Sequence, residues 1–308
     1  MLINYYLPGF LESQRIYRAL FWLKDDWPEC FYDNVNIKKI YGCFPGMIWN
    51  GGSSWFGGGV SRKLIEDTFN FYSTTGVDLQ LTFTNPLIEE KHCYDTIGNA
   101  VCEIACNYDN IEILVTSPIL EDYLRKTYPK LKIDKSIVGT TRDRGTDKDT
   151  LESYLADTEK YNMVVFPRKY SKDLDFLNSV PEDKRSCFEI LCTDPCSIHC
   201  PRLYSHYEDL ARQQLLMPCE EGQHECSGFE QGYPFRNFLY RRFQISYDEI
   251  VKDYEPLGYT EFKLSGRISY CGAALRVVPY LIKPEYQLDV YQCLLDPFAG
   301  LDVDPDFS

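Results

Sequence analysis

The chain has 308 residues, of which 44% are hydrophobic and 25% charged, a composition typical of a globular protein rather than a disordered or fibrous one. It contains no run of about 18 apolar residues, and its first residues lack the basic and apolar regions of a secretory signal, so we expect a soluble, cytoplasmic protein without a membrane span. The formal net charge of −14 disfavours contact with a phosphate backbone, and a nucleic-acid partner would need a local basic patch at Arg142–Arg144 or Arg241–Arg242.

Short β-rich runs alternate with segments of helical periodicity along the chain. The predicted strands are 3–7, 38–43, 77–83, 111–116, 133–138, 163–166, 187–191 and 260–264. The predicted helices are 12–23, 62–72, 96–106, 120–128, 150–159, 174–180, 205–215 and 273–282, with an extra helix at 247–254. Each parallel strand requires a helical crossover, so eight consecutive strand–helix units favour a closed parallel barrel.

We therefore predict the α/β class and a single (β/α)8 TIM-type barrel over residues 1–295, with an open doubly wound sheet as the alternative. No linker or composition shift marks a second domain. An irregular, cysteine-rich insertion separates units seven and eight. Residues 296–308, with four aspartates and two prolines, are expected to form an acidic C-terminal tail.

Five of the 13 cysteines lie close together in the sequence, namely Cys192, Cys196, Cys200, Cys219 and Cys226. Thiols stay reduced or bind metal in a reducing compartment, and the odd total argues against complete disulfide pairing. The first pair, Cys196 and Cys200, and a second pair brought back by a returning helix could supply four thiolates to one soft cation. Cys192 could replace any of the four. We predict a metal or iron–sulfur site, with unliganded thiols as the alternative.

Three of the four histidines, His199, His206 and His224, fall in the same region. Imidazole could serve there as a ligand or a proton carrier, or it could order a loop through hydrogen bonds. Cys43, at the end of the second predicted strand, points toward the same end of the barrel and is either a distant ligand or a core residue.

The loops that follow the strands build the active site of this type of barrel. After the eighth strand, Gly266 permits a tight turn, and Arg267 would then project its guanidinium into the mouth, where it could bind a carboxylate or phosphate or form a structural salt bridge. The glycine-rich segment 51–59 after the second strand is either a lid or ligand cradle, or a plain loop. It lacks the Lys-Ser/Thr ending of a P-loop.

Two stretches of the C-terminal third resemble the collagenase-like peptidase family. The first is the strand and cysteine loop 189–201 (EILCTDPCSIHCP), with His206 beyond it, and the second is 262–267 (FKLSGR), followed by Tyr280-Leu281 and Pro284-Glu285, which is similar to that family's Lys-x-x-Gly-Arg element and the helix behind it. The resemblance covers residues 187–285. The family includes barrel proteins with iron–sulfur clusters that support oxygen-independent hydroxylation of RNA bases and of the ubiquinone ring.

The resemblance implies a 4Fe-4S cluster on Cys196, Cys200, Cys219 and Cys226. It also implies that Arg267 contacts an anionic small molecule or modified base, with His206 as a second candidate catalytic residue.

Three functions follow from these patterns. The first is an iron–sulfur enzyme or accessory protein in an oxygen-independent hydroxylation or related redox reaction. The second is a zinc-dependent hydrolase of the peptidase type, with zinc at the thiolates and an open coordination position. The third is a non-catalytic binding or structural barrel. Neither a Gly-x-Ser-x-Gly elbow nor a His-Glu-x-x-His helix is present, so standard serine-hydrolase and zincin chemistry lacks support.

Overall fold

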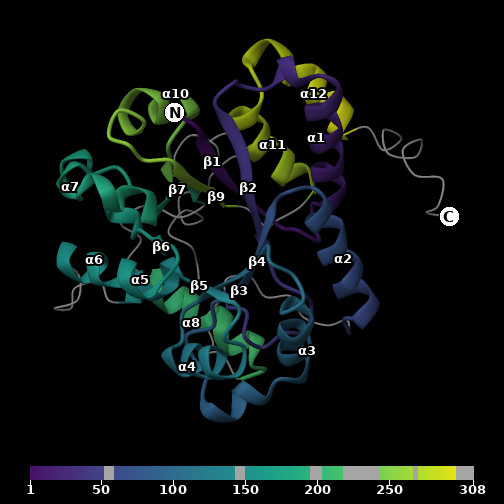
Figure 1. Ribbon diagram of the computed structural model, residues 1–308, viewed down its shortest axis with the longest axis vertical. Coiled ribbons are helices and arrows are strands. Elements are labelled where there is room, and N and C mark those ends of the chain that lie inside the picture. The colour runs from purple at the N-terminus through teal and green to yellow at the C-terminus, as the bar shows by residue number, and fades with distance from the viewer. Residues whose placement is uncertain (52–58, 143–149, 195–202, 218–242, 266–269, 296–308) are drawn as a thin grey trace, which may run out of the picture.

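The computed structural model describes residues 1–51, 59–142, 150–194, 203–217, 243–265 and 270–295. Eight parallel strands form a closed barrel, because β6 pairs with β7 and β9 pairs with β1 (Figure 1). The strands are β1 (Ile3–Pro8), β2 (Val35–Gly42), β3 (Asp78–Phe83), β4 (Ile111–Val115), β5 (Lys132–Lys135), β6 (Val164–Val165), β7 (Phe188–Asp194) and β9 (Glu261–Leu264). All eight predicted strands are confirmed, and the open sheet is wrong. A short ninth strand, β8 (Phe243–Gln244), pairs antiparallel with the end of β7.

Helices follow the strands, as the alternating pattern predicted. They are α1 (Gln14–Asp26), α2 (Arg62–Thr74), α3 (Thr96–Ala105), α4 (Pro118–Thr127), α5 (Ile137–Arg142), α6 (Leu151–Lys160), α7 (Leu174–Ser179), α8 (Leu203–Gln214), α10 (Tyr247–Glu249) with a π-helical turn (Ile250–Tyr254), α11 (Tyr270–Leu281) and α12 (Gln287–Leu295). Several begin at a side-chain cap. Ser61, Ser117 and Thr150 each accept a hydrogen bond from the backbone N–H three residues later, which satisfies a donor that the helix leaves open.

Two short helices were missed. The strand predicted at 133–138 ends at Lys135 because α5 begins two residues later, and its β-branched sequence (IVGTTR) reads as a strand. The last helix, α12, lies beyond the predicted end of helical structure at Ile282.

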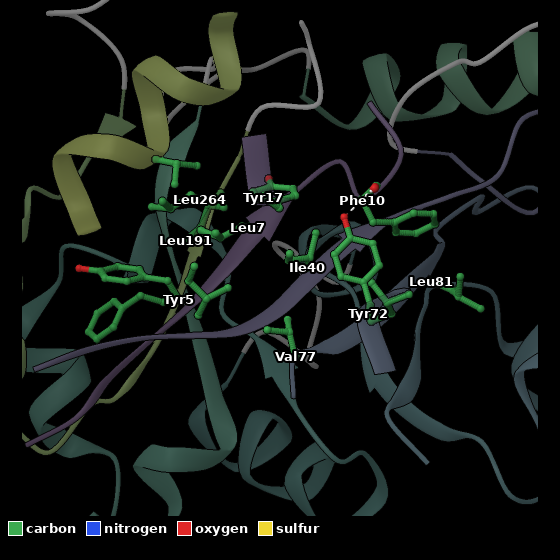
Figure 2. Close-up of a cluster of buried hydrophobic side chains, with 14 of the residues drawn as sticks. Tyr5, Leu7, Phe10, Tyr17, Ile40, Tyr72, Val77, Leu81, Leu191 and Leu264 are labelled. Carbon is green, nitrogen blue, oxygen red and sulfur yellow. Dashed lines mark hydrogen bonds between the residues drawn. The ribbon is translucent and has the colours of Figure 1, made fainter. Parts of the chain in front are cut away.

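The hydrophobic core lies between the outer face of the barrel and the helices. Side chains alternate along the strands, so Tyr5 and Leu7 of β1 face the helices whereas Tyr6 lies in a separate buried cluster with Tyr41 and Met163. Figure 2 shows Tyr5 and Leu7 in one cluster with the strand residue Ile40 and with tyrosines of α1 and α2.

The rings from α1 and α2 also fix the turn that follows β1. The hydroxyl of Tyr17 donates to the carbonyl of Pro8. That of Tyr72 donates to the carbonyl of Phe10 at 2.7 Å (Figure 2). Each ring buries a large apolar area while its polar end is satisfied. The two helices therefore hold the β1 turn at the carboxyl end of the barrel.

Among the described helices, none combines the length and the apolar character that a membrane span requires. The expected acidic tail, 296–308, lies outside the described residues, and so does most of both candidate basic patches.

Candidate functional site

Charged side chains occupy the inside of the barrel, where branched aliphatic residues are usual. Lys39 of β2 forms ion pairs with Glu112 of β4 and, at 3.2 Å, with Asp134 of β5. All three side chains are at most 5% exposed. This network was not predicted, because strands this short do not show in the sequence which of their side chains face the inside of the barrel.

A second buried pair connects to the first. Lys263 of β9 lies 2.9 Å from the carboxylate of Glu189 on β7 and donates to the side-chain oxygen of Gln80 at 3.1 Å. Gln80 in turn donates to Asp134 at 2.6 Å. Five charged groups thus share one desolvated network, in which three carboxyls face two ammonium groups.

The titration behaviour of this network follows from burial. Burial raises the pKa of the Glu189 and Glu112 carboxyls and lowers that of the Lys263 ammonium. Lys132, which is largely exposed, approaches Glu112 at 3.8 Å near the amino end of the strands, so the network extends away from the mouth, toward the end that serves stability.

A buried ion pair also lies at the carboxyl end of the barrel, the usual location of the active site. Asp194, the last residue of β7, lies 2.5 Å from the guanidinium of Arg168, which follows β6 in a 3-10 turn (Arg168–Tyr170). Both side chains are 5% exposed. The same guanidinium donates to the hydroxyl of Tyr207 on α8 at 2.8 Å. The pair thus joins the ends of two strands to a helix above them.

Helix α8 crosses the mouth of the barrel. Tyr207 contacts the residue after β6, whereas the carbonyl of Ala211 accepts a hydrogen bond from Asn85, just after β3, and Gln214 donates to the carbonyl of Met47, after β2, at 2.7 Å. In the ring order β1-β2-β3-β4-β5-β6-β7-β9, β6 and β2 are opposite each other.

Tyr207 and Gln214 are seven positions apart, which is only about 10 Å along a helix, so α8 runs over the mouth rather than around the outer wall. Its buried positions Leu203, Ala211 and Gln214 share one face with Tyr207 at helical spacing. Helix α8 also contacts α5, which follows β5 (Figure 1). It therefore covers the β2-to-β6 part of the mouth.

The sector of β9 and β7 carries further polar groups. Arg276 of α11 donates to the carbonyl of Ser265 at 2.9 Å, directly after β9. Thr193 of β7 accepts from the backbone N–H of Ser265 at 2.8 Å, and the hydroxyl of Tyr41 donates to the carbonyl of Leu264 at 2.7 Å. Arg276 was not among the predicted site residues, although side chains on a helix point toward its amino end, which for α11 is the end nearest the mouth.

Most predicted site residues lie outside the described residues. These are Cys196, Cys200, Cys219, Cys226, Arg267, His199 and His224. The glycine-rich segment lies largely outside as well, but its first residue, Gly51, is described. A Cβ there would lie 2.5 Å from the carbonyl oxygen of Thr84, so only glycine fits this close approach to the end of β3.

Three predicted residues are described. His206 lies half-buried in the first turn of α8. Cys43 is buried directly after β2. Cys192 is fully buried, with its sulfur 3.8 Å from the carbonyl oxygen of Ile190, and burial raises the pKa of its thiol. Within the described ranges, no group of three or more His, Cys, Asp and Glu side chains is arranged to hold a metal ion.

The described residues that flank the two cysteine segments meet at one strand end. Asp194 directly precedes segment 195–202, and Phe243 directly follows segment 218–242. These two residues are register partners in the β7–β8 pair, as are Thr193 and Gln244. One end of each segment is thus anchored at the carboxyl end of β7.

Comparison with known proteins supports the architecture. No family model matches the sequence, and no curated protein matches it. Among solved structures, the U32 peptidase Mk0906 is 13% identical over 87% of this chain and 94% of its own, with a TM-score of 0.51. A GH113 β-1,4-mannanase is 11% identical over 94% of this chain and 98% of its own, with a TM-score of 0.36. U32 is the collagenase-like family, and the first likeness shows a shared fold, a TIM barrel.

Proposed function

We propose that this protein is an iron–sulfur barrel enzyme or accessory protein in an oxygen-independent hydroxylation or a related redox reaction. In this proposal Cys196, Cys200, Cys219 and Cys226 hold a 4Fe-4S cluster at the mouth. The observation that carries the proposal is the β7–β8 pairing, which anchors both cysteine segments at the carboxyl end of one barrel strand.

Chain length permits the two cysteine pairs to meet. Cys200 is three residues before α8, and Cys219 is five residues after its last residue, Gln214. The helix is roughly 17 Å long, and Met217 turns back on its end, with its N–H on the carbonyl of Arg212. From Leu203 to Cys200 extended chain reaches up to about 10 Å, and from Met217 to Cys219 it reaches about 7 Å. Thiolates from both ends of α8 could therefore converge on one cluster.

The donor chemistry also suits this cofactor. Iron–sulfur clusters are held by cysteine thiolates, and the two segments contain four cysteines, whereas the fifth candidate, Cys192, lies in β7. Cys192 packs in the core with a raised thiol pKa, which favours the neutral thiol over the thiolate that a ligand must provide. When bound, the cluster would supply one-electron chemistry.

The protein's own residues would shape the site around that chemistry. The ion pair of Arg168 and Asp194 fixes the end of β7, and α8 shields part of the mouth from water. His206, in the first turn of α8, remains the candidate proton carrier, and Arg267 a candidate contact for an anionic substrate or modified base.

The test is anaerobic purification followed by iron and sulfide quantification and a visible absorption spectrum. We expect about four iron and four sulfide per chain, and we expect Cys196→Ser/Cys200→Ser to lose both. Cys30→Ser is the control, because Cys30 lies before β2, at the opposite end of the barrel.

A colourless, iron-free protein under these conditions would overturn the proposal. Stoichiometric zinc without sulfide would instead indicate the zinc-dependent hydrolase. Unchanged folding of the double variant, together with wild-type protein that contains no metal, would indicate a non-catalytic binding or structural barrel.

A further inference from the structure

The starting observation is the environment of Arg276. The side chain is half-buried on α11 and reaches the end of β9, where its guanidinium donates to the carbonyl of Ser265 at 2.9 Å. Among the described residues, no carboxylate lies within ion-pair distance of it. A guanidinium has five N–H donors in a planar fork, so one carbonyl leaves most of its capacity unused.

The nearest described carboxylate at this end of the barrel is already paired with another arginine. Arg168 is neutralised by Asp194, which lies 2.5 Å away. Asp194 also acts on Arg276 through its field, but from beyond contact distance, and burial lowers the pKa of Arg276. Among the residues that the structure describes, the partly desolvated cation thus lacks the direct anionic partner that would offset the cost of removing it from water.

Polar groups surround the same position. The hydroxyls of Thr193 and Ser265 lie 3.4 Å apart at the ends of β7 and β9. The hydroxyl of Tyr41 donates to the carbonyl of Leu264, the residue before Ser265. Thr193 and Tyr41 lie at the carboxyl ends of β7 and β2, and Ser265 directly follows β9.

Helix α8 determines which part of the mouth a ligand could use. It contacts the loops after β2, β3 and β6, and so covers the side of the mouth away from β9. Within the described part of the chain, the sector of β7, β9 and β1 is not covered by α8. Arg276 lies in that sector.

We infer that Arg276, with the hydroxyls of Thr193 and Ser265, forms a subsite for an oxyanion group, a carboxylate or phosphate, of the ligand that this barrel binds. Planar, bidentate recognition of such groups is the task for which arginine is best suited. The inference rests on the proposed function only in placing the ligand at the mouth, and it does not require the cluster.

The test is isothermal titration of the full-length protein with inorganic phosphate and, separately, with succinate at constant ionic strength. We expect saturable binding of at least one probe, and the tighter probe identifies the group. Arg276→Gln should weaken that binding about tenfold or more, because it removes a charge-assisted hydrogen bond. Arg276→Lys keeps the charge without the planar fork and should show a smaller loss.

Arg62→Gln is the control, since Arg62 is an exposed arginine on α2 paired with Glu66. Its affinity for the probe should equal that of the wild type. The inference is overturned if the wild type binds neither probe, if Arg276→Gln binds as well as the wild type, or if Arg62→Gln weakens binding equally. Iron and sulfide content is measured on the same samples. The titration then tests the oxyanion subsite, and the metal content independently tests the iron–sulfur proposal.

Discussion

The buried network inside the barrel predicts an asymmetry between two substitutions of one ion pair. Lys263 and Glu189 lie 2.9 Å apart, and their side chains are 7% and 0% exposed. Coulomb's law with an effective dielectric constant of about 20 gives an attraction of ~6 kcal/mol at this distance. Removing one partner of such a pair typically costs about 3–5 kcal/mol, because the other charge stays buried.

The charge count decides which partner matters more. Three carboxyls, Glu112, Asp134 and Glu189, share the network with two ammonium groups, Lys39 and Lys263. Glu189→Gln leaves two carboxyls and two ammonium groups, and the amide oxygen can still accept from Lys263. Lys263→Met leaves three carboxyls and one ammonium group.

We therefore expect Lys263→Met to lower the free energy of unfolding by about 3–5 kcal/mol and Glu189→Gln by about 1 kcal/mol or less. The double variant should recover about 2 kcal/mol relative to Lys263→Met alone. Guanidinium chloride denaturation followed by far-ultraviolet circular dichroism measures all three. The reasoning fails if Glu189→Gln costs as much as Lys263→Met, or if the two losses simply add.

Three further predictions concern the same framework. Burial raises the pKa of Glu189, so the contribution of this carboxyl to stability is present below the unfolded glutamate pKa of about 4.3 and is lost as pH rises through the folded pKa. As pH rises through that range, the free energy of unfolding should therefore fall less steeply in Glu189→Gln than in the wild type. Gly98→Ala should lower the melting temperature despite a gain in helix propensity, because the new Cβ would lie 2.5 Å from the ring of Trp49; a higher melting temperature would contradict this. Tyr280→Phe removes a buried hydrogen bond of 2.7 Å to the carbonyl of Ile245 and should cost about 1 kcal/mol in denaturant titrations, whereas an unchanged midpoint would show that the bond contributes nothing.

The eight strands could be predicted because each is a short β-rich run followed by helical spacing, and their closure follows from the number of units. The path of α8 could not be predicted in the same way. Helical periodicity shows that Leu203, Ala211 and Gln214 share a face, but it does not say which surface that face meets. The crossing is determined by tertiary partners such as Asn85 and Met47, which lie more than a hundred positions away in the sequence.

Candidate site residues divide along a similar line. Closely spaced cysteines indicate a metal site from the sequence alone. A charged residue within a strand, such as Lys39 or Glu189, is instead expected to face solvent, and only the closed barrel shows that it is buried. Arg276 was hidden for a related reason. It lies within an apolar helix sequence, and only the geometry of α11 against β9 brings it to the mouth.

The two proposals place opposing demands on the charge of the mouth. A cluster held by four thiolates carries net negative charge, and an oxyanion ligand beside it adds more, so the two repel each other. Both can occupy the mouth only if a cation without its own carboxylate lies near them. Arg168 cannot fill that role, because Asp194 already neutralises it, whereas Arg276 among the described residues can. The same guanidinium would then oppose the negative charge of the cluster and bind the ligand, so adding an electron to the cluster should weaken the hold of this site on an anion.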